Sequence, residues 1–355
     1  MKNLRQRIER AFRFEEVRPV PYTVWYDRNT EQRLDRHFGG ADWKDRIENC
    51  VERSVIVFEP ADYLEPGVYR DIHGTVWKQG NPVHIVKPAL AEPELRGYSI
   101  PDYTVHLKNN AGERIDYSHG VVPAFGYDQF AARFAGADGG GPLRIVGYGP
   151  GVFERGWMIR GFEDFMADLA SEPRFAEELL DQVTHRQVEL LEALCRLPVD
   201  GILFADDWGD QRDVTIGPEL WRRLIKPRVA RLYDAVHAAG KLAFQHSCGN
   251  VLAIVPDLIE IGLDCLQSLQ PEAMPVYELK KRYGRDLLLW GGLGTQELLP
   301  FGTPEAIRKE ARRLKKELGR GGGYIFSSSK PIMSDVPIEN AVAMIEESIE
   351  AKGEL

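Results

Sequence analysis

The sequence predicts an α/β protein built as a (β/α)8 barrel of the TIM type, with an N-terminal α+β elaboration. From Leu143 onward, short apolar stretches alternate with helical patterns through five strand-then-helix units joined by short loops, which is typical of a parallel sheet. The strand expected at Leu143, with one or two strands in the first half, brings the strand number close to eight. A doubly wound open sheet is the alternative, but no glycine fingerprint follows an early strand.

The length of the chain favours one large domain. A chain of 355 residues is long for a simple core and short for three domains. We therefore expect a single barrel domain over residues 1–355. Residues 1–140 would form its irregular N-terminal portion and residues 141–355 its regular β/α portion.

Composition and charge narrow the class of protein. The formal net charge of −9 disfavours a nucleic-acid-binding protein, because proteins that bind the phosphate backbone carry basic faces. No apolar run approaches the ~20 residues that a membrane helix needs, so no membrane association is expected. The opening residues contain no apolar signal core, and the four cysteines are too widely spaced to suggest a disulfide framework. These features predict a cytoplasmic protein.

The N-terminal portion is expected to mix helices and strands. Apolar residues at Leu4, Ile8 and Phe12 predict a helix that Pro19 and Pro21 end. Further expected elements are helices over residues 31–38 and 43–51, a strand over 54–58 and a turn between strands over 71–77. The glycine-rich residues 136–141 lack the Lys-Ser/Thr ending of a phosphate loop and are interpreted as a plain turn.

In the regular portion, apolar periodicity locates each element. Helices are expected where apolar residues recur every three or four positions, and Thr303 followed by Pro304 marks a helix start. The expected strands cover residues 143–146, 199–204, 241–244, 264–266, 287–290 and 323–326, and the expected helices cover 162–169, 175–194, 221–236, 251–261, 276–283, 303–318 and 337–349.

Polar residues and glycines follow the strands, at the edge where the active sites of barrels lie. Asp206 and Asp207 are adjacent, so only one carboxylate is expected to face the barrel axis, as a base or a partner for a cationic group; helix capping is the structural alternative. Gly291 and Gly292 either let a ligand approach the backbone or form a tight turn. Trp208 would stack on a planar ligand or pack in the core. The remaining candidates after the strands are Gln211, Gln267 and Lys330.

His246 and Cys248 form the most informative pair. They lie two residues apart just after an expected strand, so a nitrogen and a sulfur can point to one place, as in a zinc site. Isolated His and Cys residues more often serve packing, but the position of this pair on the expected active edge favours metal binding. A third ligand would come from Asp206, Asp207 or a distant thiol, because a catalytic zinc normally has three protein ligands.

Several stretches together resemble the uroporphyrinogen decarboxylase superfamily. The resemblance covers roughly residues 143–349 and is carried by residues 204–211, 246–250, 256–262, 291–292 and 336–340. It implies a (β/α)8 barrel and two chemistries: cofactor-free decarboxylation of uroporphyrinogen, or methyl transfer from a methylcobamide to a thiol that zinc activates. Barrels of this superfamily often form homodimers.

The chain departs from both branches of that superfamily. The Arg-Gln-Ala-Gly-Arg-Tyr segment of the decarboxylases is missing near Trp25, where only Arg28 is a possible remnant, and Ser329-Lys330-Pro331 stands where they carry a Gly-His-Gly loop. The methyltransferases use a His-x-Cys pair, which His246 and Cys248 match, and a later Cys, which falls near Lys330. The zinc ligand set is therefore incomplete in the sequence.

The leading hypothesis is a zinc-assisted methyltransferase that uses a methylcobamide carried by a partner protein and a small thiol or similar acceptor. Its expected metal ligands are His246 and Cys248, its catalytic residues Asp206, Asp207 and Lys330, and its substrate-binding residues Trp208, Gln211, Gln267, Gly291 and Gly292. One alternative is a cofactor-free decarboxylase in which Arg28, Arg155, Arg160 or Lys330 binds substrate carboxylates, while Asp206 or Asp207 stabilises developing positive charge. Another is a non-catalytic protein that binds a corrinoid or tetrapyrrole.

Overall fold

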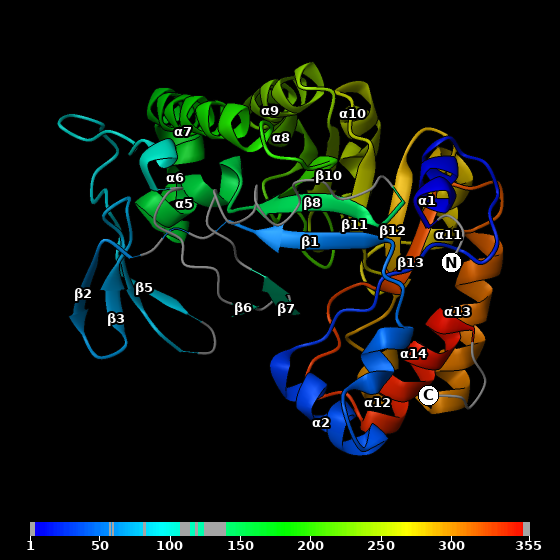
Figure 1. The fold of residues 1–355 in the computed structure, drawn as a ribbon. Helices are drawn as coiled ribbons and strands as arrows, with labels where there is room; N and C mark the ends of the chain where they lie inside the picture. The colour runs from blue at the N-terminus through cyan, green and yellow to red at the C-terminus, as the bar shows by residue number, and fades with distance from the viewer. Residues whose placement is uncertain are drawn as a thin grey trace.

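The main sheet consists of seven parallel strands that follow one another around a barrel (Figure 1). The computed structural model describes residues 4–56, 58, 60–80, 83–106, 114–117, 120–123 and 140–350. In this sheet the strand order equals the chain order, whereas a doubly wound sheet would reverse direction at a switch point, so that alternative is excluded. The strands are β1 (Val51–Val55), β8 (Leu143–Tyr148), β9 (Gly201–Ala205), β10 (Leu242–His246), β11 (Cys265–Leu269), β12 (Leu288–Leu293) and β13 (Tyr324–Ser328).

Residues 21–24 fill the eighth position of the barrel, between β13 and β1. The backbone N–H of Phe326 donates to the carbonyl of Pro21 at 2.8 Å, and the N–H of Thr23 donates to the carbonyl of Phe326 at 3.0 Å. On the other side, the N–H of Cys50 donates to the carbonyl of Tyr22 at 2.9 Å. These bonds close the sheet, and the predicted (β/α)8 barrel is confirmed.

Helices cover the outside of the sheet, as in other barrels of this class. The predicted N-cap is present, because the Thr303 hydroxyl accepts a hydrogen bond from the backbone N–H of Ala306 at 3.2 Å. The helices are α5 (Val152–Arg160), α6 (Phe162–Ser171), α7 (Pro173–Leu194), α8 (Pro218–Leu224), α9 (Lys226–Ala238), α10 (Val255–Glu260), α11 (Val276–Tyr283), α12 (Leu298–Phe301), α13 (Pro304–Glu317) and α14 (Ile338–Ile349).

Four predicted elements differ from the structure. The helix expected over 43–51 is a short 3-10 helix (Asp42–Arg46). The strand expected over 54–58 is β1, which starts earlier, at Val51, because its pairing with β8 determines its register. The helix expected over 221–236 is divided into α8 and α9 at Pro227, which lacks the N–H that a continuous helix requires. The helix expected over 251–261 begins as a 3-10 turn (Leu252–Ile254) and continues as α10.

The N-terminal portion contains the predicted α+β elaboration. Two helices, α1 (Leu4–Phe12) and α2 (Arg28–Phe38), lie before β1, and a separate antiparallel sheet has the order β2-β3-β4-β5. The turn predicted over 71–77 joins two of its strands, and most of the turn predicted over 136–141 lies outside the described residues. Across the described part of the chain, every helix is too short or too polar to span a bilayer. The further elements are β2 (Asp62–Glu65), β3 (Val68–Arg70), β4 (Val76–Lys78), β5 (His84–Lys87), α3 (Tyr103–His106), β6 (Arg114–Tyr117) and β7 (Gly120–Pro123).

Alternating side chains of the barrel strands divide the core into two parts. The larger part, which includes Val146, Ile202 and Phe204, packs against the surrounding helices. The smaller part fills the inside of the barrel, because its members are the alternate residues of the same strands. These inner residues are Val51, Leu143, Ile145, Leu203, Phe244, Cys265, Leu288, Trp290 and Ile325, with Ile8, Ala11, Val17 and Cys50 packed below them.

Candidate metal centre

Asp207, His246 and Cys248 bring three potential metal-ligand atoms together at the carboxyl ends of β9 and β10. The Sγ atom of Cys248 lies 3.4 Å from Nε2 of His246, and that nitrogen lies 3.6 Å from Oδ1 of Asp207. All three ligand atoms lie within 4.8 Å of one another. Of the three candidates for a third ligand, the structure therefore brings Asp207 to the His-Cys pair.

The spacing of these atoms fits a tetrahedral zinc ion. With usual zinc bonds to nitrogen, oxygen and sulfur, neighbouring ligand atoms lie about 3.3–3.6 Å apart. The two measured separations, 3.4 and 3.6 Å, agree with this value. A borderline-soft donor set of one nitrogen, one sulfur and one oxygen also suits zinc better than magnesium or calcium, which prefer oxygen ligands.

Gln267 orients the ring of His246. The two residues are direct neighbours in the β10–β11 register, and Nδ1 of His246 forms a short hydrogen bond with Oε1 of Gln267. Because the amide oxygen only accepts, Nδ1 carries the proton and Nε2 presents its lone pair to Cys248 and Asp207. Gln267, expected from the sequence to bind substrate, thus contacts the candidate metal ligand His246.

The loops after β9 and β10 hold Asp207 and Cys248 in place by close backbone contact. The N–H of Cys248 donates to Oδ1 of Asp207 at 2.8 Å, and the N–H of Asn250 donates to the carbonyl of Asp210 at 2.7 Å. Gly249 has a φ of +76°, and a Cβ there would lie 2.3 Å from the carbonyl carbon of Gly209. Glycine is required at position 249 for both reasons.

The electrostatics of the triad favour neutral His246 and ionised Asp207. Burial lowers the pKa of His246. Burial acts to raise the pKa of Asp207, but the N–H of Cys248 and the charge of Lys330 lower it below its ordinary value. Burial, followed by the charge of Asp207, raises the pKa of the Cys248 thiol to about 12. Two of the three groups are therefore in their metal-binding form at neutral pH.

Asp206 and Trp208 make helix-capping and packing contacts, which were the structural alternatives to the catalytic and substrate-binding roles expected for them. Asp206 is buried and accepts the N–H groups of Phe153 at 3.0 Å and Glu154 at 2.8 Å, so it caps the N-terminus of α5. The Nε1–H of Trp208 donates to the same carboxylate at 2.8 Å, and its ring packs on Trp221 with centroids 5.2 Å apart. Burial raises the pKa of Asp206 to about 6.

Gly291 and Gly292 serve the packing of the barrel wall. Both have positive φ angles, and a Cβ on Gly291 would lie 2.8 Å from the backbone nitrogen of Leu269 in the neighbouring strand. A Cβ on Gly292 would lie 3.2 Å from Leu314 of α13. Close packing, rather than the tight turn that was the alternative to ligand contact, therefore explains the need for glycine at both positions.

Lys330 and Glu154 lie near the triad, and Gln211 belongs to the exposed loop that follows β9. Lys330 is exposed, and its charge acts on both Asp207 and Cys248. Gln211 lies on the rim, where its side-chain nitrogen donates to Oε1 of Gln296 at 3.0 Å. Glu154, in the first turn of α5, was missed in the sequence because nothing but its place after an expected strand distinguishes it. Burial and then the charge of Asp207 raise its pKa well above the ordinary range.

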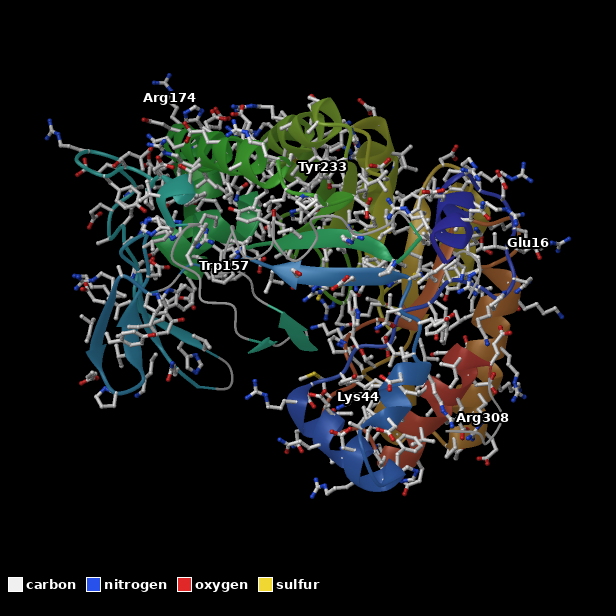
Figure 2. The ribbon with its side chains drawn as sticks, in the orientation of Figure 1. Glu16, Lys44, Trp157, Arg174, Tyr233 and Arg308 are labelled. Atoms are coloured by element: carbon white, nitrogen blue, oxygen red, sulfur yellow. The ribbon has the colours of Figure 1, made fainter. Side chains whose placement is uncertain are left out.

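The arginines considered as carboxylate-binding residues occupy different environments. Arg160 is buried and donates to Asp168 at 2.7 Å and to Asp164 at 2.9 Å, so its charge is compensated within the fold. Arg155 is buried as well, and its guanidinium lies 3.3 Å from Nδ1 of His73. Arg28 is exposed at the start of α2. The ring of Trp157, labelled in Figure 2, packs edge-on against Phe162 with centroids 5.8 Å apart.

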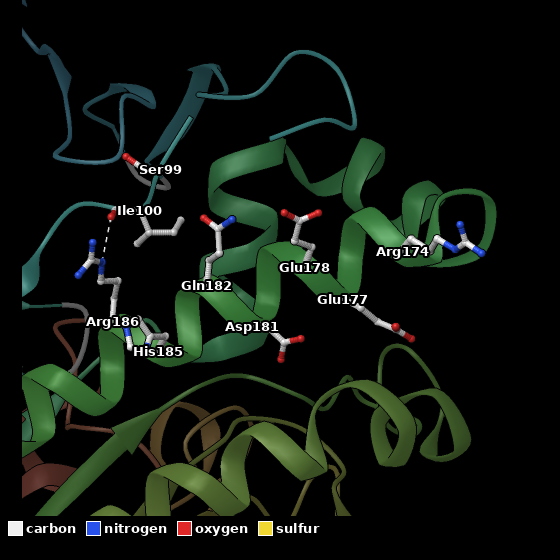
Figure 3. Close-up of a pocket in the computed structure, with 9 residues that line it drawn as sticks. All are labelled: Ser99, Ile100, Arg174, Glu177, Glu178, Asp181, Gln182, His185 and Arg186. Carbon is white, nitrogen blue, oxygen red and sulfur yellow. Dashed lines mark hydrogen bonds between the residues drawn. The ribbon is translucent and has the colours of Figure 1, made fainter. Parts of the chain in front are cut away.

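A surface groove of about 690 Å³ lies elsewhere, along the outer side of α7 (Figure 3). The Nε of Arg186 donates to the carbonyl of Ile100 across it, at 3.2 Å. No residue of the triad lines the groove, so it is separate from the candidate metal centre. Its lining residues are Ser99, Ile100, Arg174, Glu177, Glu178, Asp181, Gln182, His185 and Arg186.

A family model and individual relatives both indicate the same protein family. Residues 155–350 match the family model described as uroporphyrinogen decarboxylase (URO-D). A uroporphyrinogen decarboxylase from Thermus thermophilus is 26% identical over 216 residues, which are 58% of this chain and 59% of that protein. The chain thus spans less than two thirds of the length of that relative.

Two matches from Methanosarcina mazei are named as methyltransferases. The methylated-thiol–coenzyme M methyltransferase of this organism is 23% identical over 269 residues, which cover 76% of this chain and 65% of that protein. A solved structure described as a methyltransferase from Methanosarcina mazei superposes with a TM-score of 0.69 at 17% identity and covers 99% of both chains. At this identity the superposition supports the fold alone.

Proposed function

The chain belongs to the uroporphyrinogen decarboxylase family, and on that premise we propose that it is a methyltransferase with a zinc site formed by Asp207, His246 and Cys248. The observation that carries the proposal is the convergence of three donor atoms within 4.8 Å of one another, in which a carboxylate takes the place of a second thiol. The similarity to a methylated-thiol–coenzyme M methyltransferase supports methyl transfer.

The proposed reaction moves a methyl group from a corrinoid to a small thiol or similar acceptor. A zinc ion bound at the triad would supply Lewis acidity that lowers the pKa of the acceptor thiol. Gln267 keeps the Nδ1 proton of His246 in place, so that Nε2 faces the metal position. Lys330 adds positive charge beside Cys248 and favours the ionised form of an acceptor. We propose that a partner protein carries the methylcobamide to the barrel mouth.

The proposal is tested first by metal content and then by methyl transfer. Protein purified without chelators is expected to contain about one zinc per chain, and Asp207→Asn, His246→Ala and Cys248→Ala are each expected to lower zinc affinity at least tenfold. His185→Ala and Cys195→Ala are matched controls outside the triad. Loss of zinc in the controls, or wild-type zinc far below one per chain after zinc is added, would overturn the zinc site.

Methyl transfer is measured with free methylcobalamin and a series of small thiols. The expected result is a zinc-dependent loss of the methylcobalamin absorption that is matched by formation of the methyl thioether. Tight binding of methylcobalamin without thioether formation would support a non-catalytic corrinoid-binding protein.

Decarboxylation is the second candidate, because several relatives are named uroporphyrinogen decarboxylases. The buried contacts of Asp206 and Arg160 speak against it, since both side chains are already used within the fold. Release of carbon dioxide from an anionic tetrapyrrole by metal-free protein would favour this candidate over methyl transfer.

A further inference from the structure

Arg53 places a guanidinium group inside the barrel. It lies in β1 two residues after Val51, which belongs to the inner core, so the strand directs Arg53 to the same inner side. Val51 is buried, whereas Arg53 is half-buried and therefore in reach of solvent at the mouth. A long cationic side chain inside a barrel costs desolvation energy, which favours a functional reason for its presence.

Aromatic side chains hold this guanidinium in position. Its central carbon lies 4.9 Å from the ring centroid of Trp25, close enough for a cation–π interaction. Trp25 packs edge-on against Trp290 with centroids 4.9 Å apart, and Nε1–H of Trp290 donates to the hydroxyl of Thr23 at 2.9 Å. The stack rests on the inner core, so Arg53 is preorganised and little rotamer entropy remains to be lost on binding a ligand.

The inner positions next to this guanidinium are small or belong to the metal centre. Continuing the inward alternation, the strands place Gly147, Ala205 and Ser327 above the inner core. A Cβ on Gly147 would lie 3.1 Å from Cγ1 of Val55 and 3.9 Å from Nε of Arg53, so Gly147 borders the guanidinium. By the same alternation His246 and Gln267 also face inward, and the charge of Arg53 acts on His246.

We propose that Arg53 binds an oxyanion group of the substrate, a carboxylate, sulfonate or phosphonate, next to the metal centre, with Lys330 as a second cation on the rim. The proposal rests on the proposed zinc site and names its substrate class. Asp207 and an ionised Cys248 would neutralise a bound zinc ion, so Arg53 and Lys330 leave the mouth with positive charge. A planar guanidinium matches an oxyanion with two parallel hydrogen bonds.

The experiment compares two thiols of similar size, 3-mercaptopropionate and 3-mercapto-1-propanol, on the cobalt-substituted protein. Binding is followed by the sulfur-to-cobalt charge-transfer band, which needs no turnover. We expect the anionic thiol to bind about tenfold or more tightly than the neutral one, as a charge-assisted hydrogen bond provides. Arg53→Met should abolish this preference and Arg53→Lys should keep part of it. Arg223→Met, on the outer helix α8, is the control and should keep all of it.

An equal preference in wild type and Arg53→Met would overturn the proposal. If the protein takes up neither cobalt nor zinc, the zinc site fails, and Arg53 is then tested on metal-free protein. In that arm, acetate should raise the Tm of wild type more than that of Arg53→Met, and acetamide should not distinguish them. Equal shifts with acetate would refute oxyanion binding by Arg53.

Discussion

Replacing Gln267 by leucine tests whether the orientation of His246 determines metal affinity. The substitution removes the acceptor for the Nδ1 proton but preserves most of the side-chain volume. Gln267 is 2% exposed and His246 is 6% exposed, so water cannot reach Nδ1 to replace the lost acceptor. The imidazole would then be free to change tautomer or rotate, and Nε2 would lose its fixed direction toward Cys248 and Asp207.

The lost hydrogen bond determines how far zinc affinity should fall. Outer-shell partners of metal-binding histidines contribute about 10- to 100-fold in metal affinity. This corresponds to about 1.4–2.7 kcal/mol of binding free energy. Because the hydrogen bond here is short and both partners are buried, we expect a value in the upper half of this range.

The assay is competition for zinc against a chromophoric chelator at fixed pH. Gln267→Glu preserves an acceptor at the same position and should bind zinc at least as tightly as wild type, whereas Gln267→Leu should bind it more weakly. Melting temperatures of the metal-free variants separate a folding defect from a metal defect. Wild-type zinc affinity in Gln267→Leu would refute the orienting role of Gln267.

Two further predictions concern the triad and its loops. Zinc binding should release about one proton near neutral pH, because burial raises the pKa of Cys248 to about 12 while His246 is already neutral and Asp207 already ionised. Zinc affinity should accordingly rise about tenfold per pH unit between about pH 6 and 8, and a flat profile would contradict a thiolate ligand. Gly249→Ala should lower both the Tm and zinc affinity, because its Cβ would lie 2.3 Å from Gly209. Gly217→Ala shares a positive φ but has open space at its Cβ, so it is the control, and equal effects on zinc affinity would contradict the close-approach argument.

The sequence allowed the barrel to be predicted because the later strands are short, apolar and separated by strongly periodic helices. It did not allow the eighth position to be predicted, since residues 21–24 make only a few backbone bonds to their neighbours and two prolines, Pro19 and Pro21, interrupt the strand pattern there. The helix expected over 43–51 was wrong because pairing with β8 decides the conformation at Val51.

The candidate site was predicted in part. His246 and Cys248 are recognisable from their spacing, but Asp206 and Asp207 are identical in type and adjacent, and only packing against α5 separates their environments. Gln267 meets His246 through a register that joins distant stretches of the chain. The single-domain span, the homodimer and the cytoplasmic location remain predictions from the sequence.

The way the barrel closes has a consequence for folding during synthesis on the ribosome. Tyr22 and Phe326, whose segments complete the ring, are about 300 residues apart in the chain. During synthesis residues 21–24 must therefore keep an unpaired edge until β13 has left the ribosome. Such a long-range contact slows folding and prolongs the exposure of that edge. Nascent chains that stop before Tyr324 should consequently be the ones that aggregate or recruit chaperones.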